Sequence, residues 1–481
     1  MGTGSARVEA SADSGRAAAV LLVVAILLST LAIAIHYPGH VSMDSSMQLY
    51  EATLGKSVTW NPPHMTAILR WLGTGPDAAG RLMSLNVVLT YLSLAVSGAA
   101  LLATRGGERR AVVSRCVAIL LILLNPILFL FVGIVWKDIV FSTFMTLGAG
   151  CGILACVTDG RRAVLFALAS TVVLAIGMKV RQQGIFMAPV LLAVPFVALA
   201  VGRGLRRTQV VARGVGLVAC FLLSLVLGSH LVARTIETDP KLGNQVGFRG
   251  LMQYDVAGIT ALSKTPSDRF PVPMTDALRT EVRRVYSPDR GDFLWYSPTV
   301  TQWLSLPGYD GIRGHWWTLV RAEPRAYLQH RWEVFRAILN ADGVKACLPI
   351  HVGIDGDHRY LREIGFQPGL DRYDQDIYHF SQKIIRWPIY RHWVYLAAFA
   401  VVSGLILASA MRPRVKRASM AIALATLLLY ASYLPTSIAC DFRYLFPAVC
   451  LVSLLWIVYV ADARGRPRLG RWYVGTDSSR R

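Results

Sequence analysis

Residues 17–36 read AAAVLLVVAILLSTLAIAIH. This block carries no acidic or basic side chain except the final histidine, and it has the ~20 residues that an α-helix needs to cross the ~30 Å hydrocarbon core of a bilayer. The stretch after it, His36 to His40, lacks the small-x-small pattern of a signal-peptide cleavage site. We therefore expect the block to stay in the protein as its first membrane span.

Similar apolar blocks recur along the chain. Of its 481 residues 54% are hydrophobic and only 16% charged, and the mean hydropathy is +0.45, which is too apolar for a soluble protein. Because lipid offers the backbone no hydrogen-bond partners and the blocks show no alternation, helices are favoured over a β-barrel. We predict an all-α polytopic membrane protein with about ten transmembrane helices, at 17–36, 82–103, 116–135, 139–157, 163–178, 184–202, 214–233, 391–411, 418–438 and 445–462.

Basic residues concentrate in alternate connections between these blocks. The positive-inside rule places such connections in the cytoplasm, so both termini are expected there, in a multi-pass protein of the plasma (inner) membrane. The net charge of +21 is then mainly a topology signal and not a nucleic-acid footprint, and no nucleic-acid partner is expected. The basic residues are Arg105, Arg109, Arg110, Arg115, Arg161, Arg162, Arg203, Arg206, Arg207, Arg213, Arg412, Arg414, Lys416, Arg417, Arg464, Arg466, Arg468 and Arg471.

One polar segment, 234–390, is too long for a structureless connection. It contains helix-like stretches such as 275–285 and 324–339, so we expect a mostly helical extracytoplasmic domain inserted before the last three helices. The remaining divisions are a cytoplasmic tail at 1–16, a transmembrane module at 17–233 with a first outer loop at 37–81, C-terminal transmembrane helices at 391–462 and a basic cytoplasmic tail at 463–481.

Cys347 and Cys440 are the plausible disulfide pair on the outer side, although sequence alone does not join them. His351, Asp355, Asp357 and His358 are metal-ligand types, but their close spacing near glycines is more typical of a solvated turn. Trp295, Trp303, Trp316, Trp317 and Trp332 are more typical of core packing or interface anchoring than of sugar stacking.

Four connections on the predicted outer side place charges at the membrane edge. Each charge alone is typical of a snorkelling anchor, but together they place carboxylates beside cations. Carboxylates suit a general base that acts on a hydroxyl, and Lys or Arg suits a phosphate leaving group. The stretches are Asp44 to Glu51 with Pro62-Pro63-His64 after it, Trp136-Lys137-Asp138, Lys179 to Gln183, and Asp441-Phe442-Arg443-Tyr444.

The Asp44 loop, the Pro62-Pro63 pair and Arg443-Tyr444-Leu445-Phe446-Pro447 resemble the GT-C membrane glycosyltransferases, in particular the protein O-mannosyltransferase and lipid A aminoarabinose transferase group. The resemblance covers mainly residues 17–233. It implies a GT-C-like bundle and transfer of a sugar from a polyprenyl-phosphate donor to an envelope glycan, lipid or protein. One departure is Ser45, since the family commonly has a second acidic residue there.

The resemblance implies an inverting displacement on the extracytoplasmic face, with Asp44 as the general base. It implies that Asp138 is a second catalytic residue, which orients a cation or binds sugar. A purely structural role for Asp138, as a salt-bridge partner or a helix cap, is an equally weighted alternative. No metal ligand is assigned, although a divalent cation remains open as a cofactor, and membrane lipids are expected partners. The substrate-binding candidates are Tyr50, Glu51, His64, Lys137, Lys179, Arg181, Gln183, Arg443 and Tyr444.

Two other function classes remain open. A secondary transporter has a similar number of spans, but its charges are expected near the midplane in repeated halves. A non-catalytic envelope-assembly protein would use the inserted domain as an interaction surface and would not require Asp44.

Overall fold

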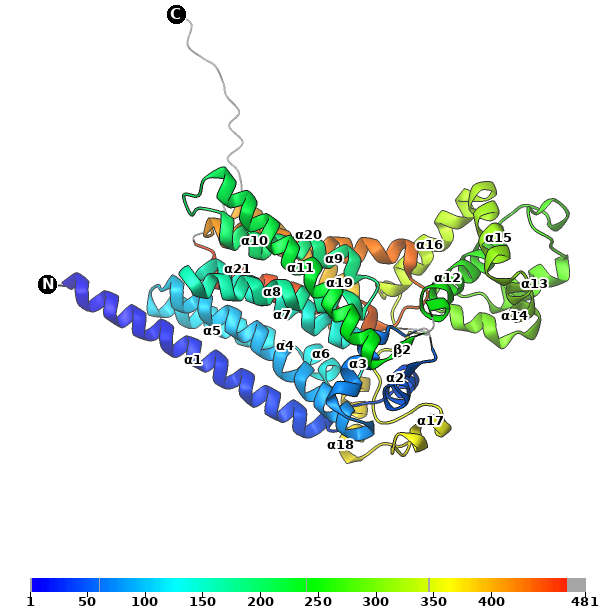
Figure 1. Cartoon of the computed structure of the whole chain (residues 1–481), viewed down its shortest axis with the longest axis horizontal. Coiled ribbons are helices and arrows are strands. Elements are labelled where there is room, and N and C mark those ends of the chain that lie inside the picture. Colours follow the sequence, from blue (N-terminus) through cyan, green and yellow to red (C-terminus); the bar gives the residue numbers. More distant parts are fainter. Residues whose placement is uncertain (1, 60, 239, 345–346, 465–481) are drawn as a thin grey trace, which may run out of the picture.

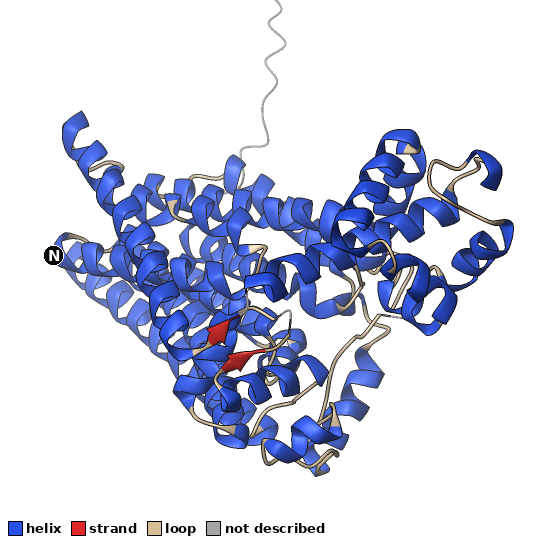
Figure 2. Ribbon diagram, turned by 45° about the vertical axis from the view of Figure 1, so that its right-hand side comes forward, coloured by secondary structure: helices blue, strands red, loops and turns tan. Residues whose placement is uncertain are grey.

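The computed structural model describes residues 2–59, 61–238, 240–344 and 347–464. Trp60 and the predicted basic tail beyond Arg464 lie outside these ranges. Within them the regular secondary structure is helical, apart from two parallel two-residue strands, β1 (Lys56–Ser57) and β2 (Glu237–Thr238). The two strands are drawn in red in Figure 2. Figure 1 shows an elongated bundle with a smaller helical lobe at one end.

The bundle contains most of the helices. They are α1 (Gly2–His36), α4 (Gly75–Arg105), α5 (Arg109–Leu123), α6 (Pro126–Val132), α7 (Lys137–Val157), α8 (Gly160–Val180), α9 (Gly184–Leu191), α10 (Ala193–Ala200), α11 (Arg207–Thr235), α19 (His392–Ala408), α20 (Pro413–Thr436) and α21 (Phe446–Asp462). Helix α7 packs against α4, α8 and α21. It lies at the centre of the bundle, since 83% of the residues in its most apolar stretch are buried. The corresponding share for α11 is 11%, so α11 lies at the periphery.

In the part of the chain that the structure describes, seven helices are long and apolar enough to cross a membrane, and an eighth candidate is the bent pair α5 and α6. The chain is thus an all-helical polytopic membrane protein with seven or eight candidate spans, fewer than the ten expected. The predicted spans 184–202 and 391–411 form apolar helices, Gly184–Ala200 and His392–Ala408, that are shorter than a full span. Proline lacks a backbone N–H and interrupts helices, and Pro189 and Pro195 lie within the first of these two.

The predicted span 116–135 is broken at Asn125-Pro126, where α5 and α6 meet at 44°. Pro126 begins the new helix, and the Asn125 side chain accepts a hydrogen bond from the backbone N–H of Ile127 at 3.0 Å. The break directs the chain after α6 alongside His40, which exchanges backbone hydrogen bonds with Gly133 and Val135 at 3.0 Å. This turn places the start of α7 beside the loop that follows α1.

The predicted insert 234–390 divides into two parts. Helices α12 (Pro240–Leu262), α13 (Asp276–Val285), α14 (Pro298–Ser305), α15 (Gly308–Ala322) and α16 (Pro324–Ile338) form the lobe, which has a hydrophobic core of its own. The return segment, 347–390, contains α17 (His358–Glu363) and α18 (Arg372–Ile384) and packs against the bundle core. Figure 1 shows α17 and α18 away from the lobe, beside α1 and the short helix α2 (Met43–Leu54).

Basic side chains gather at the end of the bundle opposite the lobe. Arg412 pairs with the buried carboxylate of Asp462 at 2.5 Å, and Arg203 and Arg414 both reach Asp159, at 3.1 and 3.3 Å. We call this end the basic end and the end that carries the lobe the site end. A disulfide joins Cys347 and Cys440 at the site end.

Candidate active site

Asp44 lies in the first turn of α2 (Met43–Leu54), a short helix docked on the start of α7. The Ser45 hydroxyl donates to the carbonyl of Val135 at 2.6 Å, and the Trp136 indole N–H donates to the Ser42 hydroxyl at 2.7 Å. These two bonds fix the helix N-terminus, where the partial positive charge of the helix favours a carboxylate. The Asp44 side chain remains 23% exposed, so it is accessible from outside the bundle.

Arg443 contacts the Asp44 carboxylate directly. Its Nη1 lies 2.7 Å from Oδ2 of Asp44, while the guanidinium sits 4.6 Å from the centre of the Trp136 ring and 5.3 Å from that of Tyr444. The side chain is 12% exposed. Aromatic faces attract a cation and do not neutralise it, so the two rings orient the guanidinium toward Asp44 without cancelling its charge.

Asp138 lies beneath the arginines and is fully buried. It forms an ion pair with Arg181, and one carboxylate oxygen is 4.0 Å from Nε of Arg443. Arg181 also lies against Tyr444, 4.9 Å from the ring centre, and donates to the Gln183 side chain at 2.8 Å. Asp138 therefore orients two cations and has no open path to a substrate.

Lys137 points toward the same cluster from the start of α7. Its Nζ donates to the amide oxygen of Asn61 at 2.8 Å, and it forms no ion pair among the described residues. Asn61 precedes Pro62 and Pro63, which open α3 (Pro63–Leu72). The proline pair has restricted backbone freedom, so it fixes the loop that supplies the amide.

Lys179 and His64 lie near each other, on the packed helices α8 and α3. Lys179, near the end of α8, forms no hydrogen bond or ion pair to any residue that the structure describes. Burial together with the charge of Lys179 lowers the pKa of His64 to about 4. The imidazole is thus neutral near pH 7 and leaves the Lys179 charge uncompensated.

The charges of the cluster set the protonation of Asp44. Burial raises the pKa of this carboxyl, but the charges of Arg443, Lys137 and Arg181 outweigh burial and leave the pKa below its ordinary value. Asp44 is therefore ionised at neutral pH.

Two of the expected substrate-binding residues lie outside the cluster. Glu51 is fully buried and closes the loop after α2, because one carboxylate oxygen accepts the backbone N–H groups of Val58 and Thr59, and the other the Thr66 hydroxyl. Tyr50 stacks on Tyr360 of α17, with ring centres 4.5 Å apart. Both side chains hold elements together at the site end and have no contact with Asp44 or Arg443 among the described residues.

The four metal-ligand types at 351–358 do not form one site. His351 bonds the carbonyl of Val41 at 2.9 Å, Asp355 accepts the N–H of Gly356, and Asp357 caps α17. Among the described residues, the group with ligand atoms close enough for a metal is Asp289 with the two disulfide cysteines.

The site also contains residues that sequence reasoning missed. Asn61 and Trp136 are neutral neighbours of residues that were singled out, and the Tyr433 ring lies 5.8 Å from Arg181. Arg290 belongs to the lobe and pairs with Asp441 at 2.8 Å. Its long separation from Asp441 in the chain leaves no sequence signal for this contact.

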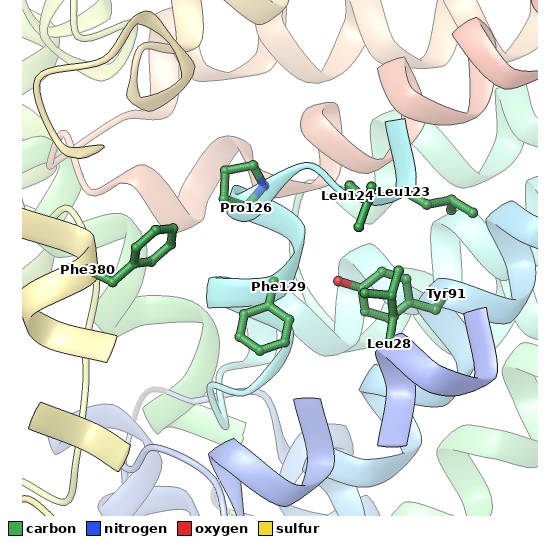
Figure 3. Close-up of a pocket in the computed structure, with 7 residues that line it drawn as sticks. All are labelled: Leu28, Tyr91, Leu123, Leu124, Pro126, Phe129 and Phe380. Atoms are coloured by element: carbon green, nitrogen blue, oxygen red, sulfur yellow. The ribbon is translucent and has the colours of Figure 1, made fainter. Parts of the chain in front are cut away.

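An apolar groove of about 300 Å³ lies elsewhere in the bundle. Figure 3 shows Phe380 of α18 across from Pro126 and Phe129 of α6, with Leu28 and Tyr91 beside the latter. No charged side chain lines it, so it is distinct from the charged cluster.

No family model matches the chain, and no curated protein matches it. Two solved structures are similar to it, ArnT from Cupriavidus metallidurans bound to undecaprenyl phosphate and the same protein in the apo state. Each is 15% identical with a TM-score of 0.32, and the matches cover 92% of this chain and 77% and 76% of the other chains. A TM-score this low carries no argument about fold or activity.

Proposed function

We propose that the protein is a GT-C type membrane glycosyltransferase that moves a sugar from a polyprenyl-phosphate donor to an acceptor hydroxyl. The proposal rests on the accessible Asp44–Arg443 pair at one end of a bundle of apolar helices. The ammonium of Lys137 lies beside this pair and has no carboxylate partner within the described ranges. This arrangement would join a base to an anion site near one end of the apolar helices, where the phosphate of a membrane lipid would lie.

The cations would bind the donor phosphate. A phosphodiester carries one negative charge, and the phosphate gains a second as the glycosidic bond breaks. Lys137 and Lys179 carry charges that no described carboxylate pairs with, and they would stabilise the growing charge more in the transition state than in the ground state. Arg443 supplies planar donors that match phosphate geometry.

Asp44 would accept the proton of the acceptor hydroxyl while that oxygen attacks the anomeric carbon and the polyprenyl phosphate departs. Its lowered pKa makes it a weak base in the resting site. A donor phosphate would compete for the guanidinium of Arg443, so donor binding would raise the pKa of Asp44 and improve proton transfer at the required step. Asp138 would act as a positioning residue for Arg181 and Arg443.

The side chains around the two aspartates disfavour a divalent cation between them. Asp44 and Asp138 are both engaged by arginines, so a metal ion would first have to displace a guanidinium. In this proposal the arginine and lysine side chains take the charge-stabilising role that a metal has in other transferases.

The sidedness of the site follows from the two ends of the bundle. Basic connections are retained in the cytoplasm, and they gather at the basic end. The site end would then face outward, where nucleotide sugars are absent and a lipid-linked donor is required. The acceptor would be an envelope glycan, lipid or protein.

The test is transfer by purified protein in liposomes that contain extracted polyprenyl-phosphate sugars and envelope acceptors, with and without EDTA. We expect release of free polyprenyl phosphate that depends on an acceptor. Solute uptake without any such release would favour a transporter, and neither activity across the donor panel would favour an assembly protein.

A further inference from the structure

Asp441 connects the lobe to the candidate active site. Its carboxylate is buried, with 1% of the residue exposed. One carboxylate oxygen accepts hydrogen bonds from the guanidinium of Arg290 at 2.8 Å and from the backbone N–H of Leu348 at 3.1 Å. The other oxygen lies 3.5 Å from Nη2 of Arg443. One carboxylate thus lies between an arginine of the lobe and the arginine that contacts Asp44.

We infer that Arg290 is a positioning residue for donor binding, acting on Arg443 through Asp441; this inference rests on the proposed function. Arg443 is shared between Asp44 on one side and Asp441 on the other, at 2.7 and 3.5 Å. Arg290 neutralises part of the Asp441 charge, and this leaves the guanidinium of Arg443 free to stay at Asp44 and to meet a phosphate.

Removal of Arg290 would leave a buried carboxylate with too little positive charge around it. Breaking a buried pair in this way is costly because the remaining charge stays desolvated. Arg443 is the other cation in contact with Asp441, so it would move toward Asp441. Its charge would then be withdrawn from the donor.

The lobe does not depend on this side chain for its attachment. The backbone N–H of Gly291 donates to Ile438 at 2.9 Å, that of Cys440 donates to Asp289 at 2.9 Å, and Arg331 donates to the carbonyl of Ser437 at 2.8 Å. The Cys347–Cys440 disulfide adds a covalent link. The effect of Arg290 is therefore separable from docking of the lobe.

The test compares variants of the full-length protein in nanodiscs by their affinity for polyprenyl phosphate. Arg290→Met should weaken binding by ~10-fold or more, and Arg290→Lys should restore part of the affinity. Arg290→Met combined with Asp441→Asn should bind better than Arg290→Met alone, because the unpaired carboxylate is gone. A purely structural role of Arg290 predicts the opposite, since the second change removes a further contact.

Arg313→Met is the matched control, since Arg313 is another lobe arginine paired with an aspartate, Asp310, at 3.2 Å. It should bind as the wild type does. Wild-type affinity in Arg290→Met, or no recovery in the double variant, would overturn the inference while the proposed function stands. A wild-type protein that does not bind polyprenyl phosphate would overturn both.

Discussion

At the scale of single residues, most charges at the site end are paired, and the described part of the chain offers no carboxylate partner to the ammonium groups of Lys137 and Lys179. Asp44, Asp138 and Arg443 meet in the structure, and Arg181 joins them. These residues were predictable because charges at the ends of apolar blocks are costly and therefore stand out in the sequence. Asn61, Trp136 and Arg290 were not, since a neutral side chain or a distant partner gives no such signal.

Asp44→Asn tests the base. The change keeps the size of the side chain and removes the proton acceptor, so transfer should fall by ~10²-fold or more, with little change in thermal stability. Transfer in liposomes and a melting curve measure the two effects. Asp77→Asn, at an exposed position at the start of α4, is the control and should transfer sugar normally. A fully active Asp44→Asn protein would place the base elsewhere.

The pH dependence of transfer tests the pairing of Asp44 with Arg443. Because the folded-state pKa of Asp44 is lowered, its carboxylate stays ionised until the pH falls below the ordinary aspartate value of ~3.9. Arg443 is the charge that lowers this pKa most, so in Arg443→Met the acidic limb of the residual kcat/KM, which reports the protein before the donor binds, should move to higher pH. An acidic limb at the same pH in both proteins would contradict the pairing.

At the scale of elements, hydropathy located helices but not their interruptions. The block 116–135 is continuous in its apolar character, yet Asn125 and Pro126 divide it into α5 and α6. The two-part division of 234–390 could not be predicted either, because α17 packs on α2 through residues such as Tyr360 that have no distinctive spacing, and α18 packs on α1. The break is a local feature, an asparagine cap followed by a proline, that a hydropathy average does not register. The division of 234–390 depends on long-range packing, which local sequence does not encode.

The disulfide at the site end is predicted to stabilise the loop that carries Arg443. Cys440 lies next to Asp441, and the bond closes a loop of 93 residues, so its loss should increase the freedom of the chain around Arg443. Reduction, or Cys347→Ser with Cys440→Ser, should lower both the melting temperature and the affinity for polyprenyl phosphate. Cys116→Ser, which removes a thiol in α5 of the bundle, should change neither. Unchanged affinity after reduction would show that Arg443 is held without the bond.

At the scale of the whole molecule, two clusters of charged residues lie at opposite ends of the bundle. The basic end contains arginines that pair with Asp159 and Asp462, and the site end contains the cluster around Asp44. This sorting was predictable from the spacing of apolar blocks and basic connections. The number of spans was not, since α9, α10 and α19 are too short to be assigned by length.

The orientation of the bundle can be measured with single cysteines in a variant that lacks the free thiols. A membrane-impermeant maleimide applied to intact cells should label a cysteine at Asp77, on the side of the site end. It should label a cysteine at Arg109, at the basic end, only after the membrane is permeabilised. The reverse pattern would place the site in the cytoplasm, where a nucleotide sugar is an available donor, and would remove the argument for a lipid-linked one.

Recognition of a lipid-linked phosphate by the cluster is the central claim. Its most direct test compares the binding of polyprenyl phosphate with that of the uncharged polyprenol to the same protein in nanodiscs. We predict that the wild type prefers the phosphate, and that Lys137→Met and Arg443→Met reduce this preference without weakening the binding of polyprenol. Equal binding of the two lipids by the wild type, or an undiminished preference in both variants, would contradict the claim.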